Sequence, residues 1–234
     1  MTVQQVVLLA GGTGERFKGV SDQAKPLIEI FGSSQIVWAL KGARLSYPGS
    51  QFFIAARSGL AKEIEKSVES SFPGLVTEYV DVGDSTSGAA ETLYRFLQSS
   101  ERVDMLSPLV SCDNDCFNLI RESYTGNFLT TVHSTNPGHC FILSDGNSYA
   151  LELHEKSLVS TVAISGNYGF AQAKIFMDYY LESNYQDKER FISSVISEML
   201  LNGEKFKLQN VAEYFSLGTP EEISNLDKRI LKYL

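Results

Sequence analysis

Short apolar runs alternate with amphipathic stretches through the first half of this 234-residue chain. The runs at 6–10, 51–56, 75–80 and 106–111 predict strands. Between them, apolar residues recur at helical spacing around 36–45, 60–72 and 90–97. The clearest case is Leu60, Ile64, Val68 and Phe72, which share one helical face. Strands that alternate with helices predict βαβ units and a largely parallel sheet.

The spacing of predicted elements changes in the second half of the chain, because between Phe128 and His154 the predicted strands lie closer together. Asp145-Gly146-Asn147 predicts a hairpin turn there, so we expect the sheet to become mixed. A further strand is expected at 168–170, and helices around 171–182 and 191–201. Thr219-Pro220-Glu221-Glu222 is a capping box that predicts a final helix with an apolar stripe reaching Leu234.

Length and composition predict one domain spanning residues 1–234, with hydrophobic and charged contents of 43% and 21% typical of a soluble globular protein. A net charge of −8 and a pI near 5.0 argue against nucleic-acid and membrane partners, which require a basic patch. The apolar run at 6–10 is too short for a signal peptide or membrane span, so we expect a cytoplasmic protein. The three cysteines are expected to be reduced thiols.

The first predicted strand runs directly into a glycine-rich turn, and two cations, Arg16 and Lys25, follow it. Glycine amides approach phosphate without interference from a Cβ atom, so the segment predicts a cradle for a nucleoside triphosphate. Phe17 stands where the dinucleotide fingerprint needs glycine, and no Gly-Lys-Ser/Thr follows as in a P-loop. We expect the following residues to contact the substrate: Leu9, Ala10, Gly11, Gly12, Thr13 and Gly14.

The segment from Leu8 to Phe17, followed by Lys25-Pro26-Leu27, resembles the signature of the sugar-phosphate nucleotidylyltransferases, or pyrophosphorylases. The chain looks like a compact form, similar to glucose-1-phosphate thymidylyltransferases and bacterial choline-phosphate cytidylyltransferases. This resemblance implies an α/β fold that is Rossmann-like, with three α/β/α layers and a mostly parallel mixed sheet. It also implies that Arg16 and Lys25 are the catalytic cations.

The segment 83–92 resembles the second motif of this family, in which a glycine, here Gly88, packs against the nucleotide base. The alternative is that Ser85, Thr86 or Ser87 merely caps the following helix, and both interpretations are compatible. Family members that bind uracil or thymine often carry a glutamine where this chain has Gly83, so the identity of the base stays open.

The strand end at Asp113 resembles the acidic motif that holds magnesium in this family, and Mg²⁺ needs only one or two carboxylates besides substrate phosphates. The alternative is that Asp113 and Asp115 are solvated turn residues. In the family a second carboxylate precedes the Gly-Thr-Pro-Glu segment, but Ser216 stands there in this chain. Asp115 or additional waters are candidates to compensate for it.

Glu155-Lys156 resembles the pair that contacts the acceptor in this family, where the acid binds hydroxyl groups and the lysine binds the phosphate. Such a pair alone is weak evidence, because most are surface charges. Its position before Gly166-Asn167-Tyr168-Gly169-Phe170, which resembles the family's next strand, strengthens the assignment. The three histidines show no metal-binding spacing and are expected to be structural or exposed.

The resemblance implies transfer of a nucleoside monophosphate from a nucleoside triphosphate to a phosphorylated small molecule, with Mg²⁺ as cofactor and release of pyrophosphate. The acceptor is a sugar 1-phosphate or another phosphomonoester, and the product would feed polysaccharide or lipid-linked glycan assembly. One alternative is a glycosyltransferase, because Asp113-Asn114-Asp115 is a D-x-D motif. Another, suggested by Ser216, is a nucleotide-binding homologue without activity. The sequence leaves the oligomeric state open.

Overall fold

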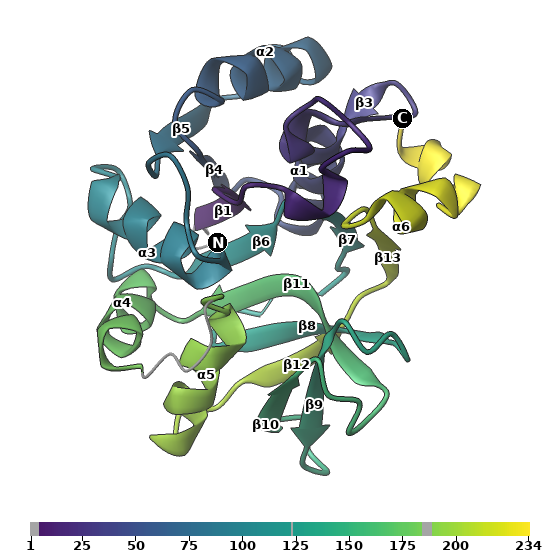
Figure 1. Cartoon of the computed structure of the whole chain (residues 1–234). Helices are drawn as coiled ribbons and strands as arrows, with labels where there is room; N and C mark the ends of the chain where they lie inside the picture. The colour runs from purple at the N-terminus through teal and green to yellow at the C-terminus, as the bar shows by residue number, and fades with distance from the viewer. Residues whose placement is uncertain (1–4, 123, 184–188) are drawn as a thin grey trace.

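The computed structural model describes residues 5–122, 124–183 and 189–234, and within them it forms a mixed sheet covered by helices (Figure 1). The strands are β1 Gln5–Ala10, β2 Glu29–Ile30, β3 Ser33–Ser34, β4 Gln51–Ala56, β5 Thr77–Asp81, β6 Leu109–Asp113, β7 Cys116–Leu119, β8 Phe128–His133, β9 Cys140–Ser144, β10 Ala150–Glu155, β11 Val162–Phe170, β12 Lys207–Asn210 and β13 Glu213–Ser216. The helices are α1 Gln35–Ser46, α2 Ala61–Ser71, α3 Ala89–Ser99, α4 Ala173–Glu182, α5 Ile192–Leu201 and α6 Pro220–Ser224, with 3-10 helices at Glu15–Phe17, Lys25–Leu27 and Lys228–Tyr233.

The main sheet has the strand order β10-β9-β11-β6-β1-β4-β5. Strand β8 also pairs with β11, and β12 pairs with β8. Strands β5, β4, β1 and β6 are parallel, whereas β11 is antiparallel to β6, so the sheet becomes mixed as predicted. In the parallel part, Leu9 of β1 lies beside Asp113 of β6. The glycine turn after β1 (residues 11–14) and the acidic loop at the end of β6 (residues 113–115) therefore leave the same edge of the sheet, where open α/β sheets bind ligands.

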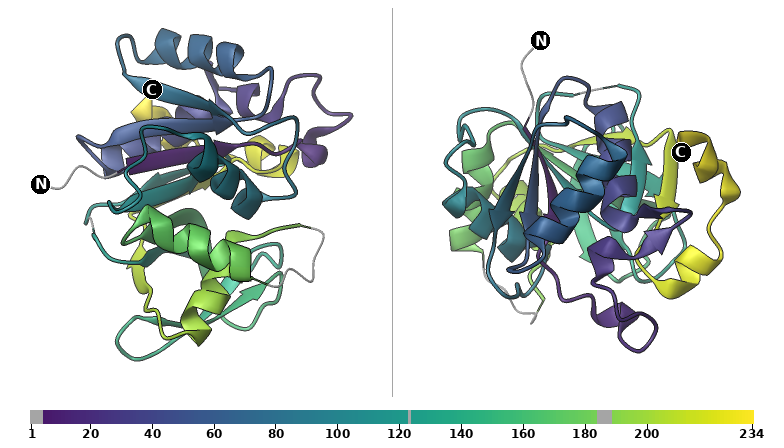
Figure 2. Two further views of the ribbon diagram at one scale, coloured as in Figure 1. Left: turned by 90° about the vertical axis from the view of Figure 1, so that its left-hand side faces the viewer. Right: turned by 90° about the horizontal axis from the view of Figure 1, so that it is seen from above.

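The sheet separates two hydrophobic cores, because successive side chains of a strand point to opposite faces. Val6 and Leu8 pack with α1 and α2 on one face, whereas Val7 and Leu9 pack with α3, α4 and α5 on the other. All four side chains are at most 4% exposed. The predicted α/β/α arrangement with a mixed sheet is confirmed, and the views in Figure 2 show it from two further sides.

The C-terminal segment packs around a third apolar cluster that includes Trp38, Phe117 and Ile230, on the side of the molecule away from α4 and α5 (Figure 2, right). The predicted helix start is confirmed, since Thr219 is the N-cap residue and its hydroxyl accepts a hydrogen bond from the Glu222 amide at 3.2 Å. The prediction of one continuous terminal helix is wrong. Helix α6 ends at Ser224, and Asp227 accepts from the Arg229 amide and begins a separate 3-10 helix.

All three cysteines are buried and free. Within the described ranges, no helix combines the length and the apolar character needed to cross a lipid bilayer.

Candidate active site

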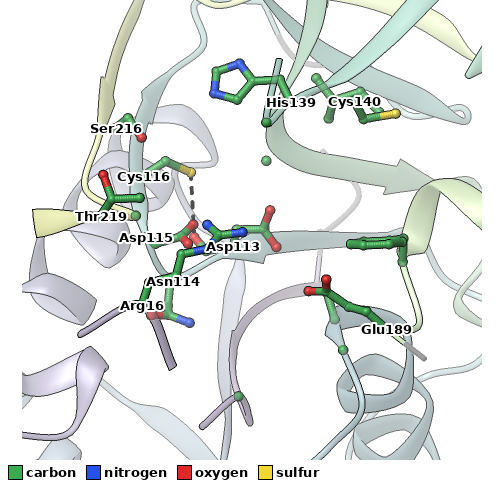
Figure 3. Close-up of a pocket in the computed structure, with 18 of the residues that line it drawn as sticks. Arg16, Asp113, Asn114, Asp115, Cys116, His139, Cys140, Glu189, Ser216 and Thr219 are labelled. Carbon is green, nitrogen blue, oxygen red and sulfur yellow. Dashed lines mark hydrogen bonds between the residues drawn. The ribbon is translucent and has the colours of Figure 1, made fainter. Parts of the chain in front are cut away.

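A cleft of about 890 Å³ opens at the carboxyl ends of β1 and β6. This volume falls in the range of small-molecule sites. Its wall includes the glycine turn, the loop after β6, the end of β10 and the segments 189–192 and 214–222. Figure 3 shows Arg16 close to Asp113, Asn114 and Asp115, with His139 above this group and Glu189 to its lower right.

The glycine turn brings its two cations to this one cleft, since Gly12 to Arg16 and Lys25 all line it. Gly14 has a φ of +72°, and a Cβ atom built on it would lie 2.9 Å from the Cβ of Lys25. Glycine at this position therefore lets the stem of Lys25 pack against the turn. Arg16 is exposed, and across residues 5–122, 124–183 and 189–234 no carboxylate lies within ion-pair distance of it.

Three of the expected contact residues, Leu9, Ala10 and Gly11, lie behind the cleft and do not line it. Leu9 and Ala10 are 4% and 1% exposed and belong to the two hydrophobic cores. A Cβ atom on Gly11 would come within 2.7 Å of the Thr92 hydroxyl, because helix α3 packs closely there. The carbonyl of Leu9 accepts a hydrogen bond from the Asn114 side chain, which ties β1 to the acidic loop.

The acidic loop places two carboxylates in different surroundings. Lys25 Nζ donates to Asp115 Oδ2 at 2.6 Å, whereas the Asp113 carboxylate accepts no hydrogen bond from the described residues. Burial and the nearby carboxylate of Asp115 raise the pKa of Asp113 well above its ordinary value. Burial also acts to raise the pKa of Asp115, but the Lys25 ammonium outweighs it and lowers that pKa. Figure 3 shows the Arg16 side chain extending toward the two carboxylates.

A bulge in β11 supports Asp113 from the side. The register with β8 shifts between Ile164 and Tyr168, and Gly166 in this bulge has a φ of +100°. A Cβ atom on Gly166 would lie 3.0 Å from Asp113 Oδ2 and 2.9 Å from Cys116 Sγ. The absence of a side chain thus leaves room for the carboxylate.

Buried polar side chains hold this bulge in place. The Thr130 hydroxyl donates to the Asn167 carbonyl at 3.0 Å and accepts from the Asn167 amide at 3.1 Å. The Asn118 side chain donates to the Ser165 carbonyl at 2.8 Å and to Asn167 Oδ1 at 3.0 Å. These residues are at most 3% exposed, so their hydrogen bonds fix the backbone beside Asp113.

Gly88 lines the cleft, but backbone packing already requires a glycine there. A Cβ atom on it would lie 2.4 Å from the Arg190 carbonyl oxygen, and the Ala90 amide donates to that oxygen at 3.0 Å. The alternative that Ser85, Thr86 or Ser87 caps α3 is wrong. Gly88 is the N-cap residue and α3 has no side-chain cap.

The end of β10 contacts the first turn of α5 at the wall of the cleft. Glu155 accepts a hydrogen bond from the Ser193 hydroxyl, and burial raises the pKa of Glu155. Lys156 Nζ lies 3.2 Å from Glu189 Oε2 and 4.6 Å from the centre of the Phe191 ring. Sequence reasoning missed Glu189, Phe191 and Ser193, because this segment is remote in sequence from Glu155 and contains no recognisable motif.

His139 also lines the cleft, on the loop between β8 and β9. Burial lowers its pKa, so its imidazole is neutral at pH 7. Its Nδ1 is buried and has no hydrogen-bond partner in the described part of the chain. The sequence predicts that His139 is structural or exposed, and it does not predict that His139 lines the cleft.

The ionisable side chains of the cleft fit a substrate that arrives with a divalent cation. Six are acidic (Glu15, Asp113, Asp115, Glu155, Glu189 and Glu222) and three are basic (Arg16, Lys25 and Lys156), which leaves a formal charge of −3 with histidine neutral. A polyphosphate alone would be repelled by this excess. The free carboxylate of Asp113 is the type of hard oxygen ligand that Mg²⁺ prefers, and few protein ligands suffice when substrate phosphates and waters supply the others. No group of three or more His, Cys, Asp or Glu side chains within the described residues could hold a metal without such help.

No protein-family model and no curated protein matches the sequence. Solved structures do match the fold. A nucleoside-diphosphate-sugar pyrophosphorylase from Vibrio cholerae superimposes with a TM-score of 0.82 at 17% identity, and the match covers 94% of this chain and 98% of that one. A UDP-glucose pyrophosphorylase complexed with UDP-glucose gives 0.75 at 14% identity, covering 96% and 97%. An inositol-1-phosphate CTP transferase from T. maritima gives 0.76 at 12% identity, covering 99% and 94%. The chain therefore has the fold of these nucleotidyltransferases over nearly its whole length.

Proposed function

We propose that this protein is a nucleotidylyltransferase that joins a nucleoside triphosphate to a phosphorylated small molecule and releases pyrophosphate. The observation that carries the proposal is the convergence of the glycine turn, Arg16, Lys25 and Asp113 on one cleft. The matching solved structures are two pyrophosphorylases, one of them complexed with UDP-glucose, and an inositol-1-phosphate CTP transferase, and their fold supports the proposal.

The reaction does not require a protein base. The second pKa of a phosphomonoester is about 6, so its dianionic oxygen is already a nucleophile near neutral pH. Among the cleft residues the one histidine, His139, is therefore not assigned a role in proton transfer. The protein must then position the two substrates and neutralise their charge.

Arg16 and Lys25 would divide this neutralisation. Attack on the α-phosphorus moves negative charge onto the departing pyrophosphate, and the planar guanidinium of Arg16 suits its oxygens. Lys25 would hold the acceptor phosphate or the α-phosphate, because its ammonium, unlike the Arg16 guanidinium, pairs directly with Asp115 of the acidic loop. Asp113 would hold Mg²⁺, which when bound neutralises the triphosphate.

Glu155 and Lys156, which also line the cleft, would contact the acceptor, with Glu155 oriented by Ser193. A carboxyl group there is suited to hydroxyl groups of a sugar or polyol, and Lys156 is suited to a phosphate. The structure favours no particular nucleotide base.

A pyrophosphate-release screen tests the proposal. The purified protein is incubated with Mg²⁺ and each of the common nucleoside triphosphates, alone and with a panel of sugar 1-phosphates and other phosphomonoesters. Acceptor-dependent pyrophosphate supports it. Formation of a nucleoside diphosphate from a nucleotide sugar would favour a glycosyltransferase, and nucleotide binding without turnover would favour an inactive homologue.

A further inference from the structure

The ammonium group of Lys25 is fixed by an unusually sheltered ion pair. Its Nζ lies 2.6 Å from Asp115 Oδ2, and the two side chains are only 17% and 27% exposed. In every other ion pair of the described residues, at least one partner is 38% exposed or more. Screening by solvent is therefore weakest for this pair.

Asp115 is itself anchored from the last strand of the chain. Its backbone carbonyl accepts a hydrogen bond from the Leu217 amide at 2.8 Å, and the next residue, Cys116, pairs with Ser216 between β7 and β13. A Cβ atom on Gly218 would lie 3.2 Å from Asp115 Oδ2, so the absence of a side chain at Gly218 leaves room for this carboxylate. Two segments about a hundred residues apart thus determine where the carboxylate stands.

The opposite end of the pair is anchored as well. Lys25 Cβ packs against Gly14 of the glycine turn, and Pro26 fixes the backbone at the start of a 3-10 helix. A lysine side chain otherwise has several rotatable bonds and considerable freedom. One ammonium carries three donors, so a bond to Asp115 leaves two for phosphate oxygens.

The two carboxylates of the loop therefore have separate tasks. We propose that Asp115 is a positioning residue, which holds the Lys25 ammonium in the cleft in the orientation that receives the substrate phosphate, while Asp113 stays free. This inference rests on the proposed function for the identity of the phosphate. The contact between Asp115 and Lys25 does not depend on it.

A double-mutant cycle with Lys25→Ala and Asp115→Asn tests the proposal. Asp115→Asn should lower kcat by about 10- to 100-fold, the scale of a misplaced group, with KM for both substrates within about threefold. In the Lys25→Ala background the same change should have no further effect on kcat, because Asp115 acts through Lys25. An equal loss of kcat in both backgrounds would overturn the proposal.

A second readout is independent of turnover. In NMR spectra of the ¹⁵N-labelled protein, the Lys25 ammonium signal, assigned by its loss in Lys25→Arg, should be visible in the wild type and broadened away in Asp115→Asn. Persistence of the signal in Asp115→Asn would contradict the positioning role. Should that variant not fold, Asp115→Glu keeps the charge, and it should retain the signal while lowering kcat.

The matched control is Asp178→Asn, which removes the partner of Lys174 from an ion pair of the same 2.6 Å length but 54% exposed on both sides. Its kcat should equal that of the wild type, and a comparable loss would overturn the assignment. A wild-type protein that turns over no substrate pair would refute the proposed function, whereas the ammonium signal would still decide the role of Asp115.

Discussion

Gly166→Ala should damage the candidate site more than it damages the fold. The substitution places a methyl group 3.0 Å from Asp113 Oδ2 and 2.9 Å from Cys116 Sγ, at a φ of +100°. The backbone conformation alone costs a residue with a Cβ atom about 1–2 kcal/mol. Overpacking against buried neighbours adds about 1–3 kcal/mol. The carboxylate of Asp113 is the neighbour with most freedom to yield, so it should move.

Gly203→Ala separates these two costs. Gly203 has a similar φ of +89°, and a Cβ atom on it would meet nothing within 4 Å. For a chain of this size about 1 kcal/mol shifts Tm by about 2–4 °C, so Gly166→Ala should melt about 2–12 °C below Gly203→Ala. Thermal unfolding and the magnesium dependence of pyrophosphate release are measured on both variants. Gly166→Ala alone should need more Mg²⁺ for half-maximal rate, and equal melting temperatures with identical magnesium curves would refute the reasoning.

Three further predictions follow from the same geometry. Arg16→Ala should lower kcat/KM by about 10²- to 10³-fold, which is the effect of removing one group that stabilises transition-state charge. The control Arg121→Ala lies outside the cleft and should leave kcat/KM unchanged. Steady-state rates check this, and an unchanged rate for Arg16→Ala would exclude its role. Asp113→Asn should raise the Mg²⁺ concentration for half-maximal rate, and an identical titration curve would move the ligand elsewhere. Burial raises the folded-state pKa of Glu155, so the folded protein favours the protonated carboxyl. Its contribution to the free energy of unfolding is fully present below the ordinary pKa of about 4.3 and is lost as the pH rises. In urea unfolding, Glu155→Gln should therefore gain stability relative to the wild type as the pH rises above about 4.3, and a constant difference would contradict this.

The parallel part of the fold was predictable because its signals are local. The run at 51–56 coincides with β4, and the apolar spacing from Leu60 to Phe72 predicts α2 Ala61–Ser71 with its end before Pro73. Strands β7, β12 and β13 were missed. They are short, and each depends on a partner distant in sequence, as in the pairing of Cys116 with Ser216.

The cleft was predictable only where residues close in sequence carry it. The glycine turn, Arg16 and Lys25 share one segment, and the cleft indeed collects them. The pairing of Lys25 with Asp115 depends on the sheet order, and no sequence pattern encodes it. Sequence reasoning also treated Leu9 and Ala10 as contacts because they adjoin the turn, although the alternation of the strand directs them into the two cores.

An isotope-transfer experiment tests the central claim most directly. With the substrate pair found by the screen, the acceptor phosphate is labelled with ¹⁸O and the product is examined by ³¹P NMR. Attack by the acceptor phosphate on the α-phosphorus predicts one ¹⁸O atom bridging the two phosphorus atoms, seen as an isotope shift on both signals, together with unlabelled pyrophosphate. A product whose nucleotide phosphorus carries no ¹⁸O, or label appearing in the pyrophosphate, would contradict the account.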